Sequence, residues 1–105
     1  MARYLLNSAV LTGFGDWTYR PVSIEEAKSF VAYEFVCAIR YEPTAAKLSE
    51  LLGVEIVAND VIVAMNKDDQ ALVIRPAKRL NKREVLAANQ TDEIEWELGM
   101  LTRIH

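Results

Sequence analysis

The chain has 105 residues, which is enough for one domain with one hydrophobic core that folds without covalent cross-links. A single cysteine excludes an internal disulfide, a single histidine at the last position argues against a Cys/His metal site, and no apolar run approaches the roughly 20 residues of a membrane-spanning helix. The lack of such a run predicts no membrane partner. The net charge of −3 argues against the broad basic face that double-stranded DNA requires, and it leaves a local basic pocket open.

The N-terminal segment predicts a strand followed by a loop. Residues 1–4 lack the form of a secretory signal, so we expect a cytoplasmic protein. Residues 4–11 predict a buried strand that turns polar at Asn7 and Ser8. The loop at residues 12–16 contains a Gly-x-Gly with no helix after it, which indicates a turn rather than a phosphate site.

The next segment predicts a helix with a strong N-terminal cap. Residues 17–20 predict a short extended piece that ends at Pro21. Ser23 and Glu26 have the spacing of a capping box, in which the Ser23 hydroxyl accepts from the Glu26 amide and Glu26 reaches back. An apolar stripe then continues the helix to about Glu34. The stripe consists of Ile24, Ala27, Phe30 and Val31.

A strand and a second helix follow. Residues 35–39 are continuously apolar and predict a strand buried on both faces, so Cys37 is interpreted as a small buried hydrophobe rather than a nucleophile. Pro43 suits the first turn of a helix, and Gly53 suits a left-handed cap at its end. Residues 54–57 then predict a strand or the start of one.

The remaining apolar segments predict three more strands. Residues 61–65 and 71–75 flank a five-residue polar loop and predict a hairpin, with Pro76 at its end. Alternation over residues 94–100 predicts a last strand, although the spacing over residues 93–98 also fits a helix.

The predicted fold is α/β (α+β), a single domain over residues 1–105 with a mixed sheet of about five or six strands and two or three packed helices. The third helix would lie near residues 83–88. Five cations fall within nine residues of this region, and they indicate either a solvated face or an anion site. They are Arg75, Lys78, Arg79, Lys82 and Arg83.

Four stretches have the order and spacing of a known family. They are residues 4–11; residues 37–45 with 48–54; residues 59–65 with 70–73; and Arg79-Leu80 with Val85-Leu86 and residues 96–101. Together they resemble the viral ring nuclease family, the type III anti-CRISPR proteins of viruses and mobile elements. The resemblance covers nearly the whole chain, and its most specific part is Leu48-Ser49-Glu50-Leu51-Leu52-Gly53.

The resemblance implies a homodimer with a mixed sheet. Members of the family bind cyclic tetra-adenylate, the second messenger of type III CRISPR defence, in a pocket across the dimer interface. They cleave it without a metal or other cofactor. A ribose 2′-hydroxyl attacks the adjacent phosphate, a histidine protonates the leaving oxygen, and an arginine and a glutamate assist.

The catalytic positions depart from the family pattern. Where the family has Gly-His, this chain has Arg40-Tyr41, and where the family has an assisting glutamate, it has Lys82. Arg79 matches. Tyr41, Arg79 and Lys82 are therefore candidates for residual catalysis, and none of them is assigned a catalytic role. The alternative for Tyr41 is a hydrophobic plug with its hydroxyl at the surface.

The small polar positions agree better with the family. The family's Asn-Arg before the predicted hairpin is Asn59-Asp60 here, which replaces a cation by an anion. The residues that match ligand contacts of the family, or supply compensating charge, form the candidate binding set. They are Asn7, Ser8, Arg40, Thr44, Gln70 and Arg79. The alternative is structural, with Thr44 as a helix cap and Asn7 as a turn former.

Three functional hypotheses remain open. The first is an anti-defence protein that binds cyclic tetra-adenylate at a dimer interface with little or no cleavage. The second is an active, metal-independent ring nuclease with a relocated acid. The third is a protein-binding CRISPR inhibitor, or a DNA-binding dimer, on the same fold.

Overall fold

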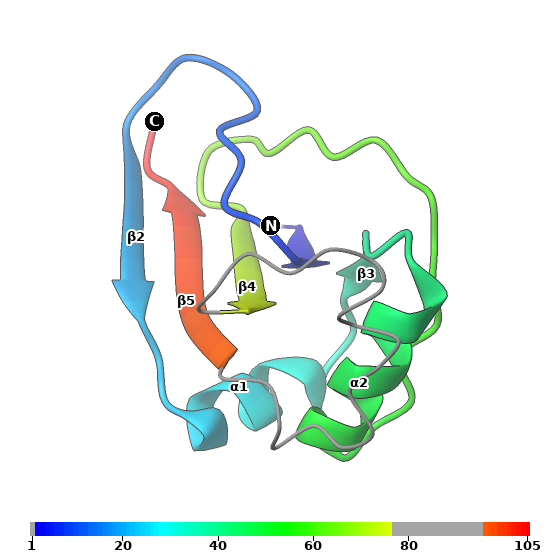
Figure 1. The fold of residues 1–105 in the computed structure, drawn as a ribbon. Coiled ribbons are helices and arrows are strands. Elements are labelled where there is room, and N and C mark those ends of the chain that lie inside the picture. Colours follow the sequence, from blue (N-terminus) through cyan, green and yellow to red (C-terminus); the bar gives the residue numbers. More distant parts are fainter. Residues whose placement is uncertain (1, 77–95) are drawn as a thin grey trace.

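The computed structural model describes residues 2–76 and 96–105, and these form one mixed sheet with two helices packed on it (Figure 1). This arrangement confirms the predicted fold class. The elements in chain order are β1 (Arg3–Leu6), β2 (Trp17–Pro21), α1 (Ile24–Val31), β3 (Val36–Cys37), α2 (Glu42–Leu52), β4 (Gln70–Pro76) and β5 (Trp96–Arg103).

The strands lie in the order β2-β5-β4-β1-β3. β1 pairs in parallel with β3 on one side and with β4 on the other, while β5 runs antiparallel to both β4 and β2. After β1 the chain runs to β2 at one edge of the sheet, then through α1 to β3 at the other edge, and then through α2 to β4 beside β1. Because β1 and β3 are parallel neighbours, their carboxyl ends lie at the same edge of the sheet.

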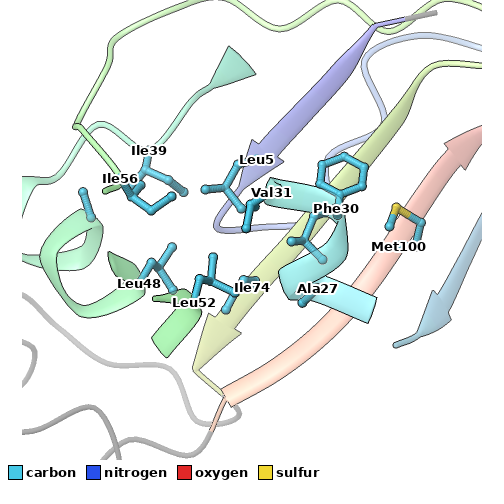
Figure 2. Packing of buried hydrophobic residues seen from close by; sticks show 12 residues of the cluster. Leu5, Ala27, Phe30, Val31, Ile39, Leu48, Leu52, Ile56, Ile74 and Met100 are labelled. Atoms are coloured by element: carbon cyan, nitrogen blue, oxygen red, sulfur yellow. The ribbon is translucent and has the colours of Figure 1, made fainter. Parts of the chain in front are cut away.

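Alternating residues of the central strands face two separate apolar clusters. One set of side chains faces the helices and belongs to the larger cluster, which is drawn in Figure 2 and includes Phe30 and Leu48 of the helical side. This set consists of Leu5, Leu72, Ile74 and Met100. Their neighbours face the opposite side of the sheet, where Met65 covers them. These neighbours are Leu6, Ala71, Val73 and Leu101.

The start of α1 confirms the predicted cap. The Ser23 hydroxyl accepts a hydrogen bond of 3.1 Å from the Glu26 amide. The Glu26 carboxylate does not turn back to Ser23; it pairs with Arg20 on β2 at 2.6 Å. The helix ends at Val31, three residues before the predicted end, and the Arg3 guanidinium donates to the Phe30 carbonyl there.

The ends of α2 also follow the sequence signals. Pro43 lies in the first turn, and Gly53 caps the C-terminus with a φ of 72°, a left-handed conformation that glycine adopts without steric cost. The N-cap is Tyr41, so Thr44 lies inside the helix and the structural alternative for it, a helix cap, is wrong.

The predicted hairpin is wrong. Residues 61–65 form no strand, nor do residues 54–57, and β4 pairs with β1 and β5 instead. Residues 53–69 form a long coil from α2 to β4 (Figure 1), with isolated apolar side chains such as Ile56 and Met65 buried. Because single apolar side chains of the coil are buried, its sequence resembles that of a strand although its backbone forms no ladder of strand hydrogen bonds.

Two expectations about strands need correction, and one is confirmed. β1 ends at Leu6 rather than continuing toward residue 11, and β3 is an edge strand whose Val36 is exposed and whose Cys37 is only partly buried. β5 is a strand, as the alternation predicted. The possible helix at residues 83–88 lies outside the described residues.

Candidate functional site

A cavity of about 490 Å³ opens at the carboxyl ends of β1 and β3. Because these strands are parallel neighbours, the residues that follow each strand emerge at the same edge of the sheet, where open α/β sheets commonly bind ligands. The segment after β1 and the segment after β3 form two walls of the cavity, and the coil before β4 forms the third. The lining residues are Leu6, Asn7, Ser8, Val10, Thr12, Ala38, Arg40, Tyr41, Val61, Ile62 and Val63.

Side-chain and backbone hydrogen bonds fix the three walls against one another. The Ala38 amide donates to the Leu5 carbonyl at 3.0 Å, which continues the β1–β3 pairing. The Asn59 amide donates to the Ile39 carbonyl at 2.8 Å, and its side-chain amide donates to the Cys37 carbonyl at 2.9 Å. The coil is thereby held against the outer edge of β3.

The third wall is also tied to the loop after β1. The Met65 amide donates to the Thr12 hydroxyl at 2.9 Å, and the Arg103 guanidinium donates to the Met65 carbonyl at 2.6 Å. These bonds hold the far end of the coil beside residues 7–12. The cavity is therefore bounded by segments fixed at several points.

Among the described residues, Arg40 is the charged group that lines the cavity, and it pairs with Asp60 just outside the lining. The Arg40 Nε and the Asp60 Oδ1 are 2.9 Å apart, and the two side chains are 68% and 80% exposed. Arg40 directly precedes Tyr41, the N-cap of α2, so it lies near the partial positive charge of a helix N-terminus. Glu42 in the first turn offsets part of that charge.

The chemistry of the lining suits a ligand with both anionic and apolar parts. A guanidinium can bind a phosphate through two parallel hydrogen bonds, and the Asn7 amide and Ser8 hydroxyl can donate or accept. Val10, Val61 and their neighbours supply an apolar wall. Among the described residues, no group of three or more His, Cys, Asp or Glu side chains could hold a metal ion.

The structure brings together part of the residue set that the sequence singled out. Asn7, Ser8, Arg40 and Tyr41 all line the cavity. Thr44 is partly buried within α2, outside the lining.

The other predicted site residues lie elsewhere. Gln70 begins β4 opposite Arg3, so it lies at the amino end of β1, the opposite end of the strand from the cavity. Arg79 and Lys82 lie outside the described residues.

Several lining residues carried no signal in the sequence. Thr12 lies in a loop that the glycine pattern marked only as a turn, and Ile62 belongs to a segment that was expected to pair as a strand. The pairing of Arg40 with Asp60 spans twenty residues of chain and depends on where Asn59 anchors the coil. No local pattern encodes that contact.

A second cavity, of about 520 Å³, lies at the other end of β1 and β3. Its cation, Arg3, donates to the carbonyls of Phe30 and Glu34 and lies 4.0 Å over the Phe30 ring. The Arg3 guanidinium is thus used at the C-terminus of α1, so this cavity suits an anionic ligand less well than the cavity lined by Arg40.

Comparison with known proteins places the chain among viral proteins. A profile of the family described as STIV B116-like matches residues 3–98. The chain is 32% identical over 109 residues to the uncharacterized protein ORF117 of Acidianus two-tailed virus, covering 96% of this chain and 92% of that one. It is 33% identical over 103 residues to the uncharacterized protein 26 of Sulfolobus islandicus filamentous virus (isolate Iceland/Hveragerdi), covering 92% and 87%.

A solved structure shares the fold. B116 of Sulfolobus turreted icosahedral virus superimposes with a TM-score of 0.81 over 98% of this chain and 100% of that chain. The sequence identity is 20%, so this likeness establishes the common architecture. None of the described helices is both long enough and apolar enough to cross a membrane.

Proposed function

This chain belongs to the STIV B116-like family, and we propose that it is a viral or mobile-element anti-defence protein that binds cyclic tetra-adenylate with little or no cleavage. The ligand would lie in a pocket shared by two copies of the chain, in the cytoplasm of an infected or lysogenic host cell. The observation that carries the proposal is the joint placement of Asn7, Ser8, Arg40 and Tyr41 around one cavity at the carboxyl ends of two parallel strands.

Each of these groups has a role that the proposed ligand can use. The Arg40 guanidinium matches a phosphate in charge and geometry. The Asn7 amide and the Ser8 hydroxyl can hydrogen-bond ribose hydroxyls or adenine edges. The Tyr41 ring can stack on a base, an interaction worth roughly 1–3 kcal/mol per base.

The size and rim of the cavity favour a shared pocket. A volume of about 490 Å³ lies within the range of small-molecule sites but suits a part of a four-nucleotide ring rather than the whole. Ile62 at the rim is 93% exposed, and Val10, which also lines the cavity, is exposed as well. A second copy related by a two-fold axis would cover these apolar groups and double every polar group around a symmetric ligand.

Weak cleavage follows from the residue that precedes α2. In-line attack by a ribose hydroxyl needs a proton donor at the leaving oxygen, and such general acid catalysis is worth roughly 10²–10⁴-fold. A phenol releases its proton far less readily than an imidazolium, so Tyr41 is a poor replacement for a histidine. Binding and alignment are expected to remain, with slow turnover at best.

The test is isothermal titration with cyclic tetra-adenylate, followed by single-turnover incubation with the protein in excess. We expect binding that weakens at least tenfold in Asn7→Ala and in Arg40→Gln, with no change in Lys28→Gln, an exposed cation on α1 outside the lining. Chromatography should show mostly intact ligand. Complete conversion to linear products within minutes would establish an active ring nuclease instead.

A second candidate function is binding of a host protein. Phe14 is fully exposed between Gly13 and Gly15, and the Arg103 guanidinium donates to its carbonyl at 2.6 Å, which fixes the loop. Aromatic side chains, phenylalanine included, are enriched in the cores of protein interfaces. Failure to bind the nucleotide, together with capture of a CRISPR component that Phe14→Ser abolishes, would favour this function.

A further inference from the structure

The cation at the cavity mouth already holds an anion from its own chain. The Arg40 Nε lies 2.9 Å from the Asp60 Oδ1. Arg40 lines the cavity, whereas Asp60 lies just outside it, next to Val61 and Ile62 of the third wall. The carboxylate therefore contacts the guanidinium from the coil side, where both side chains are exposed to solvent.

The position of Asp60 is fixed by the residue before it. The Asn59 amide and side chain donate to the carbonyls of Ile39 and Cys37, at 2.8 and 2.9 Å. Because these bonds tie the coil alongside the segment that carries Arg40, the next residue of the coil is held within reach of the guanidinium. This anchoring places the Asp60 and Arg40 side chains within reach of each other.

We propose that Asp60 is an intramolecular competitor that occupies Arg40 until a ligand phosphate displaces it. The inference rests on the proposed function, because it names a group of this chain that competes with the ligand at the same cavity. A phosphate that binds Arg40 has to replace the carboxylate, so every ligand that uses Arg40 binds less tightly than it would without Asp60.

The exchange is feasible because the ion pair is weak. It is solvent-exposed on both sides, and exposed pairs contribute little to stability because water screens them. A phosphate can accept two parallel hydrogen bonds from a guanidinium, so it can take the place of the Asp60 carboxylate on Arg40. The competitor thus lowers affinity without blocking the site.

The experiment compares four proteins in titrations with cyclic tetra-adenylate: wild type, Asp60→Asn, Arg40→Gln and the double variant. We expect Asp60→Asn to bind roughly three- to fivefold more tightly than wild type, with less than a twofold gain from the same change in the Arg40→Gln background. Glu55→Gln removes the same charge from the same coil outside the lining, and it should change affinity less than twofold.

Two results with the nucleotide would overturn the inference while leaving the proposed function intact. One is equal affinity of wild type and Asp60→Asn. The other is an equal gain in the Arg40→Gln background, because Asp60 would then act by general repulsion and not by holding Arg40.

A separate readout covers the case in which no variant binds the nucleotide, a result that would reject the proposed function. The ¹⁵N signal of the Arg40 Nε, assigned by its loss in Arg40→Gln, is followed during titration with inorganic phosphate. A midpoint at least threefold lower in Asp60→Asn than in wild type supports the competitor role. Equal midpoints overturn it.

Discussion

Gly99 on β5 leaves the space that the ring of Tyr19 occupies on the neighbouring strand. A Cβ added at Gly99 would overlap the outer ring atoms and hydroxyl of Tyr19, so the ring would have to move. The hydroxyl lies 3.4 Å from the Glu97 carboxylate, which also accepts from Arg75 at 3.0 Å. Burial first, and then the charge of Glu97, raises the pKa of Tyr19, so the phenol stays protonated at neutral pH.

The glycine should therefore show opposite effects in two backgrounds. Gly99→Ala displaces the Tyr19 ring, and we expect a loss of about 1 kcal/mol in the free energy of unfolding. In a Tyr19→Ser background the same change meets no ring, and it should stabilise by about 0.5 kcal/mol because alanine loses less backbone entropy than glycine in a strand. Urea denaturation of the four proteins measures both values. Equal effects in the two backgrounds would show that the ring does not set the requirement for glycine.

At the scale of elements, the coil between α2 and β4 is held by side chains rather than by strand pairing. The Ser49 hydroxyl on α2 accepts from the Ile56 amide at 2.8 Å and lies within hydrogen-bond distance of the carbonyls of Ala45 and Ile56. Ile56 is buried in the main cluster against the helices. One hydroxyl thus fixes the point at which the coil leaves α2.

Removal of that hydroxyl should loosen the coil. Ser49→Ala leaves the Ile56 amide without its acceptor, and a buried unsatisfied donor costs about 1–3 kcal/mol. We expect a loss in that range by urea denaturation, together with faster hydrogen exchange in residues 54–60. Ser29→Ala, an exposed serine on α1, is the matched control and should change stability by less than about 0.5 kcal/mol. A Ser49→Ala protein as stable as this control would contradict the anchoring role.

The same coil shows which parts of the fold a sequence can predict. The cap at Ser23, the left-handed Gly53 and the alternation in β5 depend on local rules, and all three predictions are confirmed. Residues 61–65 have the composition of a strand, yet they bury Met65 and part of Val61 and Val63 while their backbone lies outside the sheet. The pairing of β4 with β1 is decided by contacts nearly seventy residues apart in the chain, which no local pattern contains.

For the candidate site, too, local sequence signals place the individual residues, whereas the contacts between distant segments could not be predicted. Arg40 and Tyr41 could be placed near the start of a helix because Pro43 follows them. Asn7 and Ser8 could be placed after a strand because the apolar run becomes polar there. That both pairs border one cavity depends on β1 and β3 being parallel neighbours, and the apolar third wall depends on the path of the coil.

At the scale of the whole molecule, the proposed dimer predicts which exposed apolar residues matter. Ile62 lies on the cavity rim, whereas Phe14 lies on the loop before β2 and outside the lining, and both are more than 90% exposed. If two copies share the pocket, the second copy must cover Ile62 at the rim, and it need not cover Phe14 on the loop before β2. We therefore expect wild type and Phe14→Glu to be dimers at tens of micromolar, and Ile62→Glu to be a monomer, by light scattering after size-exclusion chromatography.

The physical reason is the cost of burying a charge. A glutamate in place of Ile62 would carry its carboxylate into an apolar contact without a partner, and desolvation of an unpaired charge costs several kcal/mol, enough to weaken association by at least a hundredfold. Both variants lie at exposed positions, so their unfolding transitions should match that of wild type and exclude a folding defect. A monomeric wild type would reject the shared pocket, and a dimer broken by Phe14→Glu but kept in Ile62→Glu would move the interface to the loop.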